Sequence, residues 1–252
     1  CDEVKEDGFD LVDDFSDLFG MNAAGTDAKM RNTKESILEA QFTSGAGNWC
    51  TWMFGRDLVN WNNNFTWAKW VTPSRDLISA FKQEGDEVRF KESIVYYDCN
   101  WSNYYPSDNY PFMYKCRSAN SSIIKYRYAD VLLLKAEALI MQDTPDLEGA
   151  ADIIDEVRDR AKLGALPTSV RSNKNVLLNA LLKERRLELA FEGQRWFDLV
   201  RLDKVEEVMN AVYSKDSGRK AQIYTFDKNS YRLPIPQSVI DANDKIHQNP
   251  GY

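Results

Sequence analysis

The chain has 252 residues, of which 43% are hydrophobic and 28% charged, and its formal net charge is −7. This length is enough for one large domain or two small ones with a sizeable core. The acidic balance argues against a nucleic-acid groove, which needs a basic stripe. The one histidine, His247, argues against a histidine-based triad or a multi-histidine zinc site, and no apolar run is long enough to span a bilayer.

Four cysteines, Cys1, Cys50, Cys99 and Cys116, form no CxxC pair, which excludes zinc-ribbon and thioredoxin-type sites. An even count allows disulfides in an oxidising compartment without requiring them. A bridge among the last three and buried free thiols are both consistent with the sequence. We expect no metal and no cofactor.

The first 42 residues combine an acidic start with one strand candidate. Leu11, Phe15 and Leu18 recur at helical spacing, which predicts a short helix, and residues 20–34 have the composition of a loop. The segment ESILEAQF (35–42) fits either a strand or a short buried run, because its period does not decide between them.

About half of the aromatic residues lie in two stretches, 43–74 and 96–114. The first stretch also holds five asparagines and few charges, and neither the helical nor the strand period runs through it. We therefore predict a long irregular loop there, and such loops in compact domains are usually functional.

Helical periodicity dominates the second half of the chain. The expected elements are helices over 72–81, 123–141, 146–161 and 174–201, and a strand over 86–97. Thr72 and Thr144, each followed by proline, supply helix-start signals. Two consecutive antiparallel helices of this length match a tetratricopeptide-type hairpin. Gly193, inside the last helix, predicts close packing, and the terminal segment 223–252 should hold one short helical run at most.

Alternating charges over 184–202 have two interpretations. An anion site at Arg185, Arg186 and Arg195 is one, and a structural network that braces the helix is the other and is favoured. The network interpretation predicts four buried and mutually paired side chains, namely Glu184, Arg185, Glu188 and Arg195.

Tryptophan among asparagines in an uncharged loop suits sugars, because a pyranose face packs on a ring and its hydroxyls need amide partners. The candidate stacking platforms are Trp61, Trp67, Trp101 and Tyr104, with Asn62, Asn64 and Arg56 as polar contacts. The alternative is that these rings cap the hydrophobic core beneath a long loop. We predict no catalytic residue: Asp57 and Asp98 are the carboxylates nearest the rings, and surface or structural roles are far commoner for such groups.

Four motifs point to a known family: YRYADVLLLKAEAL (126–139), VRDRA (157–161), KERRLELAFEGQRWFDLVRL (183–202) and the terminal YRLPIPQSVIDANDKIHQNPGY. With them, the sequence resembles the C-terminal half of the RagB/SusD family of outer-membrane nutrient-binding lipoproteins. The resemblance implies a mostly α fold of tetratricopeptide-like helical hairpins with a long irregular, aromatic-rich ligand-binding portion. That portion would span 35–120, the helical scaffold 121–202 and a C-terminal tail 203–252 of a single domain over 1–252.

The same resemblance implies a non-enzymatic receptor on the surface of a Gram-negative bacterium. Such a protein captures oligosaccharides and passes them to a SusC-like TonB-dependent outer-membrane transporter. Family members are longer than this chain, so a lipid anchor lies either at Cys1 or outside the chain, and the second reading is favoured. The alternative function is a protein-interaction subunit of the transporter complex with no sugar site in this half, and an enzyme is the third.

Overall fold

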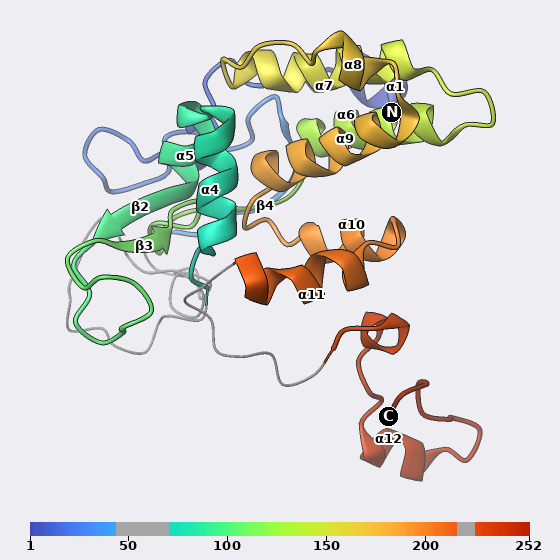
Figure 1. Cartoon of the computed structure of the whole chain (residues 1–252). Helices are drawn as coiled ribbons and strands as arrows, with labels where there is room; N and C mark the ends of the chain where they lie inside the picture. The colour runs from blue at the N-terminus through green and yellow to red at the C-terminus, as the bar shows by residue number, and fades with distance from the viewer. Residues whose placement is uncertain (44–70, 216–224) are drawn as a thin grey trace. The chain divides into compact units, whose positions relative to one another are not determined.

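The computed structural model describes residues 1–43, 71–215 and 225–252. They form two compact units, Cys1–Gly193 and Gln194–Tyr252. The described chain is mostly helical, which confirms the predicted fold class, and its strands pair as two short antiparallel ribbons in the first unit (Figure 1). None of the described helices is long and apolar enough to cross a membrane.

Three helices form the scaffold of the first unit: α6 (Tyr128–Met141), α7 (Leu147–Arg160) and α9 (Lys174–Glu188). They pack side by side (Figure 1), with short α8 (Thr168–Arg171) between α7 and α9 along the chain. Their shared core is fully buried and mixes small with branched side chains: Ala129, Leu133, Ala136, Ile140, Ala150, Ala151, Ile154, Leu177 and Leu181. The alanines let the helix backbones approach closely, while the leucines and isoleucines supply the buried apolar area.

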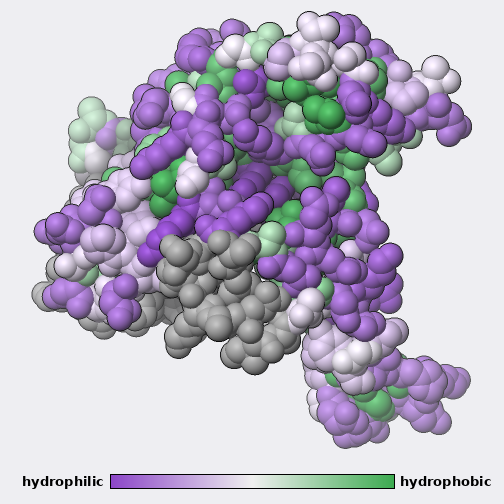
Figure 2. Space-filling view, in the orientation of Figure 1, coloured by the Kyte–Doolittle hydropathy of each residue, from purple (hydrophilic) through white to green (hydrophobic). Residues whose placement is uncertain are grey.

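The exposed residues of α7 are all acidic, whereas those of α6 are apolar: Leu134, Ala138 and Met141. On the face shown in Figure 2, hydrophilic residues predominate and hydrophobic residues show in smaller patches. Helix α7 thus shows the pattern of an amphipathic helix that buries one face against its neighbours.

Side-chain caps set the starts of two predicted helices. Helix α4 (Arg75–Glu84) begins after Ser74, whose hydroxyl accepts from the amide of Leu77, and not after Thr72 as predicted. Asp146 caps α7 in the same way, although Thr144 was expected to do so. In both segments the predicted helix is present but the predicted capping residue was wrong, because several residues near each start can accept a hydrogen bond.

Two other segments differ from the prediction. The expected strand over 86–97 begins as helix α5 (Glu87–Ser93), capped by Asp86, and only its end is strand β2 (Ile94–Tyr97). The helix expected from residue 123 begins at Tyr128, since the preceding residues form strand β4 (Ile123–Arg127). Strand β4 pairs with β1 (Ser36–Ala40), which settles the 35–42 segment as a strand, and β2 pairs with β3 (Tyr110–Met113).

The helix predicted over 174–201 is two helices, α9 and α10 (Arg195–Arg201). Phe191 and Gly193 have positive φ angles of 67° and 84°, which no α-helix contains. A Cβ at Gly193 would meet nothing within 4 Å, so the prediction of close packing there was wrong. The glycine relieves backbone strain at the helix break.

The short helix predicted from the N-terminal apolar spacing forms only in part, around Leu18. The segment contains only the short α1 (Asp2–Glu6) and α2 (Ser16–Phe19), although Leu11 and Phe15 are buried. The amide of Asp10 donates to the carbonyl of Lys34, and the amide of Val12 donates to the carboxylate of Glu35. These bonds to the segment before β1 replace the bonds that a helix would make.

A buried network of charged side chains joins the helices to the strands. Glu188, at the end of α9, accepts hydrogen bonds from Arg127 (2.5 Å), Arg89 (3.0 Å) and Arg160. Glu35 accepts from Arg127 and from Arg160, each at 2.7 Å. Although burial alone would raise it, the attraction of Arg160, Arg127 and Arg89 holds the pKa of Glu188 well below its ordinary value.

The burial predicted for this network is confirmed for Glu184, Arg185 and Glu188, but the mutual pairing was wrong. Glu184 accepts from Arg89 at 2.6 Å, and Arg185 donates to Asp130 at 2.8 Å. The partners come from other elements because each side chain points away from its own helix into the core. Arg195 is only half-buried and belongs to the second unit.

The second unit contains α10, α11 (Val205–Lys215), a short 3₁₀ helix, η1 (Lys228–Tyr231), and α12 (Gln237–Ala242). The terminal segment thus has two short helical runs where one at most was expected. Between them and after them, side-chain amides tie down the irregular backbone. Gln248, for example, exchanges two hydrogen bonds with the backbone of Ile235, at 2.8 and 2.9 Å.

Candidate functional site

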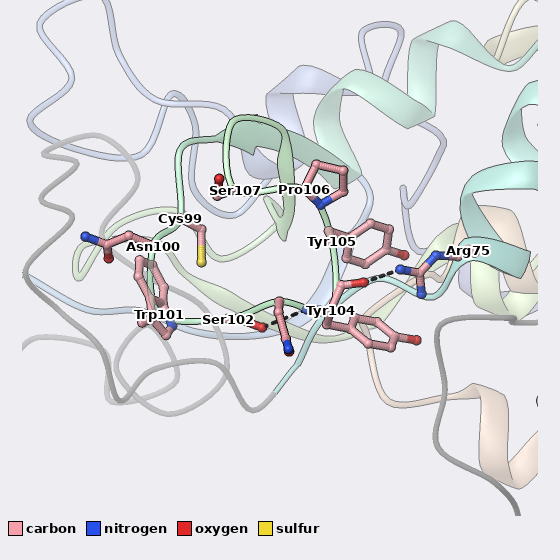
Figure 3. A pocket seen from close by; sticks show the side chains of 10 residues that line it. Arg75, Cys99, Asn100, Trp101, Ser102, Tyr104, Tyr105, Pro106 and Ser107 are labelled. Carbon is pink, nitrogen blue, oxygen red and sulfur yellow. Dashed lines mark hydrogen bonds between the residues drawn. The ribbon is translucent and has the colours of Figure 1, made fainter.

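The candidate site is a hollow of about 840 Å³ beside the loop that joins β2 to β3. Among the described residues, 99–107 and Arg75 line it, so one connecting loop supplies nearly all of the lining that the structure describes (Figure 3). The ends of this loop are held close, because Tyr97 and Tyr110 are paired in the ribbon and the amide of Cys99 donates to the carbonyl of Ser107 at 2.6 Å. The short ribbon thereby presents the loop on a fixed base.

Aromatic rings fill the inner side of this loop. Tyr110 and Phe112 of β3 are buried, with ring centroids 5.1 Å apart. Trp101 packs against Phe112 at 6.0 Å, and Tyr105 packs against Tyr110 at 5.5 Å. Tyr104 stands edge-on to Tyr105, with centroids 5.0 Å apart and ring planes at 90°. This geometry is favourable for aromatic pairs and fixes the loop rings on the ribbon.

Trp101 and Tyr104 are half-buried, which leaves part of each ring accessible. In Figure 3 both rings extend from the same loop, with Ser102 between them in sequence, and both line the hollow. Rings that are anchored on one side and open on the other can act as stacking surfaces.

Arg75, at the first position of α4, braces the loop from outside. Its guanidinium lies over the rings of Tyr104 and Tyr105, at 4.5 and 4.2 Å from their centroids. It also donates a hydrogen bond to the carbonyl oxygen of Tyr104, and the Tyr105 hydroxyl donates to the carbonyl of Pro73 at 2.7 Å. These contacts link the loop to the start of α4.

The polar lining consists of short amide and hydroxyl side chains. Asn100, Asn103 and Ser107 are exposed, and the Ser102 hydroxyl accepts from the amide of Tyr104 at 3.3 Å. Arg75 is the one ionic side chain among the described residues that line the hollow. Flat rings, amides and hydroxyls with little charge match the requirements of a neutral polyhydroxylated ligand.

The structure brings two of the seven predicted ligand-binding residues together, Trp101 and Tyr104. The other five lie outside the described residues: Arg56, Trp61, Asn62, Asn64 and Trp67. Asp98 is exposed, and Asp57, its suggested carboxylate partner, also lies outside the described part. Among the described residues, no cluster of three or more histidine, cysteine or acidic side chains could hold a metal ion.

Arg75 and Tyr105 were not among the predicted site residues. The contact between the Arg75 guanidinium and the rings of Tyr104 and Tyr105 joins residues almost thirty positions apart, so the sequence alone does not predict it. Asn100 and Asn103, in the second aromatic stretch, were not predicted as polar contacts either. Both are exposed and line the hollow, and they are next in sequence to Trp101 and Tyr104.

Comparison with known proteins decides the family. Residues 110–252, more than half of the chain, match the SusD family (SusD_RagB). The chain belongs to the SusD family. The resemblance noted in the sequence is therefore confirmed, and the matched part includes β3, the scaffold helices and the second unit.

Two SusD-like proteins of Formosa agariphila are similar in sequence. SusD-like protein P38 is 43% identical over 99 residues, which cover 37% of this chain and 19% of that protein. SusD-like protein P2 is 36% identical over 143 residues, which cover 54% of this chain and 27% of that protein. The alignments thus cover a minor part of each relative.

Solved SusD-like structures match nearly the whole chain. A laminarin-binding SusD-like protein is 26% identical with a TM-score of 0.64, over 97% of this chain and 54% of that one. Surface glycan-binding protein A from Bacteroides thetaiotaomicron in complex with laminarihexaose has a TM-score of 0.71 at 19% identity, over 98% of this chain and 57% of that one. The chain spans little more than half the length of these relatives.

Proposed function

We propose that this chain is a glycan-binding part of a SusD-family receptor that captures oligosaccharides without cleaving them. The observation that carries the proposal is the placement of Trp101 and Tyr104 on the wall of one hollow, each anchored by other rings and each partly accessible. Asn100, Asn103 and Ser107 supply the amide and hydroxyl partners that sugar hydroxyls need.

The comparisons support the same class of ligand. Two solved relatives are named for laminarin binding and for a laminarihexaose complex, so glucans are the first ligands to test. Trp61, Trp67, Asn62, Asn64 and Arg56 remain proposed contacts of the same ligand. We further propose that the whole protein is lipid-anchored on the cell surface and delivers its glycan to a SusC-like TonB-dependent transporter.

The test titrates the chain with laminarihexaose, maltohexaose, xylohexaose and mannohexaose. Tryptophan fluorescence detects binding, and product analysis afterwards detects cleavage. We expect one or more hexasaccharides to shift the emission and to be recovered uncleaved. Trp101→Ala and Tyr104→Ala should each weaken binding about tenfold or more, because each removes a stacking surface.

Tyr126→Ala is the matched control, since Tyr126 is 56% exposed on β4 and lies outside the hollow. The melting temperatures of the three variants, measured in parallel, separate loss of binding from loss of fold. Release of shorter sugars would favour an enzyme. Failure of every hexasaccharide would favour the protein-interaction subunit.

A further inference from the structure

A second hollow, of about 620 Å³, lies in the first unit and shares no lining residue with the first. Its walls come from the loop after α2, the end of α5 and the two ends of the β2–β3 ribbon. The side chains that matter most are those of Glu92, Tyr97, Tyr114 and Arg117. Tyr97 and Tyr114 are half-buried, so their rings are partly accessible from this hollow.

Arg117 is held rigidly at the base of the hollow. It is 4% exposed, and its guanidinium lies 3.6 Å from the centroid of the Tyr114 ring. Its Nε donates to the carbonyl of Tyr114 at 2.8 Å, and its Nη2 donates to the carbonyl and the carboxylate of Glu92 at 3.1 and 2.9 Å. The hydrogen bonds of Arg117 within residues 1–43, 71–215 and 225–252 use Nε and Nη2, and none of them uses Nη1.

Two further polar atoms of the same hollow also have no hydrogen-bond partner within the described chain. Glu92 uses Oε2 for Arg117, and within the described chain neither its Oε1 nor the Tyr114 hydroxyl makes a hydrogen bond. Burial and the neighbouring Tyr114 raise the pKa of Tyr97. The hollow therefore offers a donor, an acceptor and a hydroxyl that can be either, on one fixed framework.

The charges of this hollow are compensated. Arg117 is paired with Glu92 at 2.9 Å, and Lys29 is paired with Asp17 at 2.6 Å and Asp14 at 3.1 Å. An anion or a cation would gain little here, because it would have to displace an existing pair. A neutral ligand that both donates and accepts fits better, and two adjacent hydroxyls do this: one donates to Oε1 of Glu92 while its neighbour accepts from Nη1 of Arg117.

We propose that this second hollow binds a sugar residue through a pair of adjacent hydroxyl groups, an inference that rests on the proposed glycan-binding function. The two hollows are linked through the ribbon: Tyr97, which lines the second, packs on buried Phe112 at 6.4 Å, and Phe112 packs at 6.0 Å on Trp101, which lines the first. A chain of several sugars that reaches both hollows gains affinity by being held twice.

The test measures amide hydrogen exchange of the 252-residue chain with and without each of the four hexasaccharides. Residues 98–107 report on the first hollow, and residues 16–29 and 114–117 report on the second. We expect the same hexasaccharide to slow exchange in both regions. Tyr114→Phe keeps the ring under Arg117 and removes only the hydroxyl, so the affinity measured from the second region should fall by about three- to tenfold.

Tyr126→Phe is the matched control and should leave both regions unchanged. Protection of 98–107 alone, or equal effects of Tyr114→Phe and Tyr126→Phe, would overturn the second site while the proposed function stands. Protection of the second region alone would support the second site and overturn the first. Protection of neither region by any hexasaccharide would overturn both.

Discussion

Glu35, just before β1, accepts a 2.7 Å hydrogen bond from Arg160, at the end of α7 and 125 residues further along the chain. Both side chains are buried, and Glu35 also accepts from Arg127. The pairing fastens the N-terminal strand to the helical scaffold with charge-assisted bonds that water does not reach.

Removal of the Glu35 carboxylate should therefore be costly. Glu35→Ala leaves two buried arginines with one partner fewer, and we expect the free energy of unfolding to fall by about 3–5 kcal/mol. Lys34→Ala is the neighbouring control and should change little, because Lys34 is exposed and pairs at 3.2 Å with the exposed carboxylate of Asp13. Urea denaturation measures both, and equal midpoints for the two variants would contradict the role given to the network.

The same network predicts sensitivity to acid. Charge pairs hold the pKa of Glu188 and of Glu192 below the ordinary value near 4.5, despite burial, which opposes this. A depressed carboxyl pKa gives stability that is fully present above about 4.5 and is lost as the pH falls through the folded value. Asp86 acts in the opposite sense, because burial raises its pKa.

The melting temperature should therefore drop steeply between pH 5 and pH 3, because about two carboxylates, those of Glu188 and Glu192, must take up protons on unfolding. Glu188→Gln should flatten this dependence, since it removes one of them. A melting temperature that is constant or rises over this range would contradict the expectation.

Two adjacent leucines of α6 give a direct test of the scaffold core. Leu133 is fully buried and Leu134 is 36% exposed. Leu133→Ala should lower the free energy of unfolding by about 2–5 kcal/mol, because it leaves a cavity among α6, α7 and α9. Leu134→Ala should lower the free energy of unfolding much less. Thermal unfolding of the two variants in parallel measures the difference, and a larger loss of stability for Leu134→Ala would contradict the orientation of α6.

The break between α9 and α10 predicts a difference between two glycines. Gly193 has a φ of 84°, whereas Gly164 lies outside the positive-φ region, and neither would place a Cβ within 4 Å of other atoms. Gly193→Ala should destabilise by about 1 kcal/mol or more, because an L-residue is strained there. Gly164→Ala should be neutral or slightly stabilising, and the comparison by denaturant titration isolates the backbone term.

Arg75 gives a prediction about the proposed sugar site. Arg75→Ala removes the guanidinium from the faces of Tyr104 and Tyr105 and its bond to the Tyr104 carbonyl. We expect faster amide exchange over residues 98–107 and weaker oligosaccharide binding, with little change in the melting temperature. Lys82→Ala, an exposed position near the other end of α4, should affect none of these.

Much of the scaffold could be predicted from local pattern. The apolar spacing of 146–161 identified α7 to within one residue at either end, because that helix buries one face and caps itself with Asp146. The α5 segment could not be predicted in this way. Its helix contains Arg89, which is fully buried and satisfied by Glu184 and Glu188, almost a hundred residues away, and no local rule supplies those partners.

The candidate site also contains residues that the sequence predicts and residues that it does not. Trp101 and Tyr104 could be chosen from composition, because a ring-rich stretch with little charge is visible in one sequence. Arg75 and Arg117 could not, since each acts through aromatic or acidic neighbours that the fold brings together. The distinction between a ring in the core and a ring at a rim, as with Tyr110 and Tyr104, also needs the three-dimensional arrangement.

The spread of the charged network along the chain has a consequence for synthesis. Glu35, Arg89, Arg127 and Arg160 leave the ribosome before Glu188, the residue that joins three of them. Until then these charges have no complete set of partners, and desolvating them would be unfavourable. The first unit should therefore stay open and hydrated during translation and close late, in one step that depends on contacts distant in sequence.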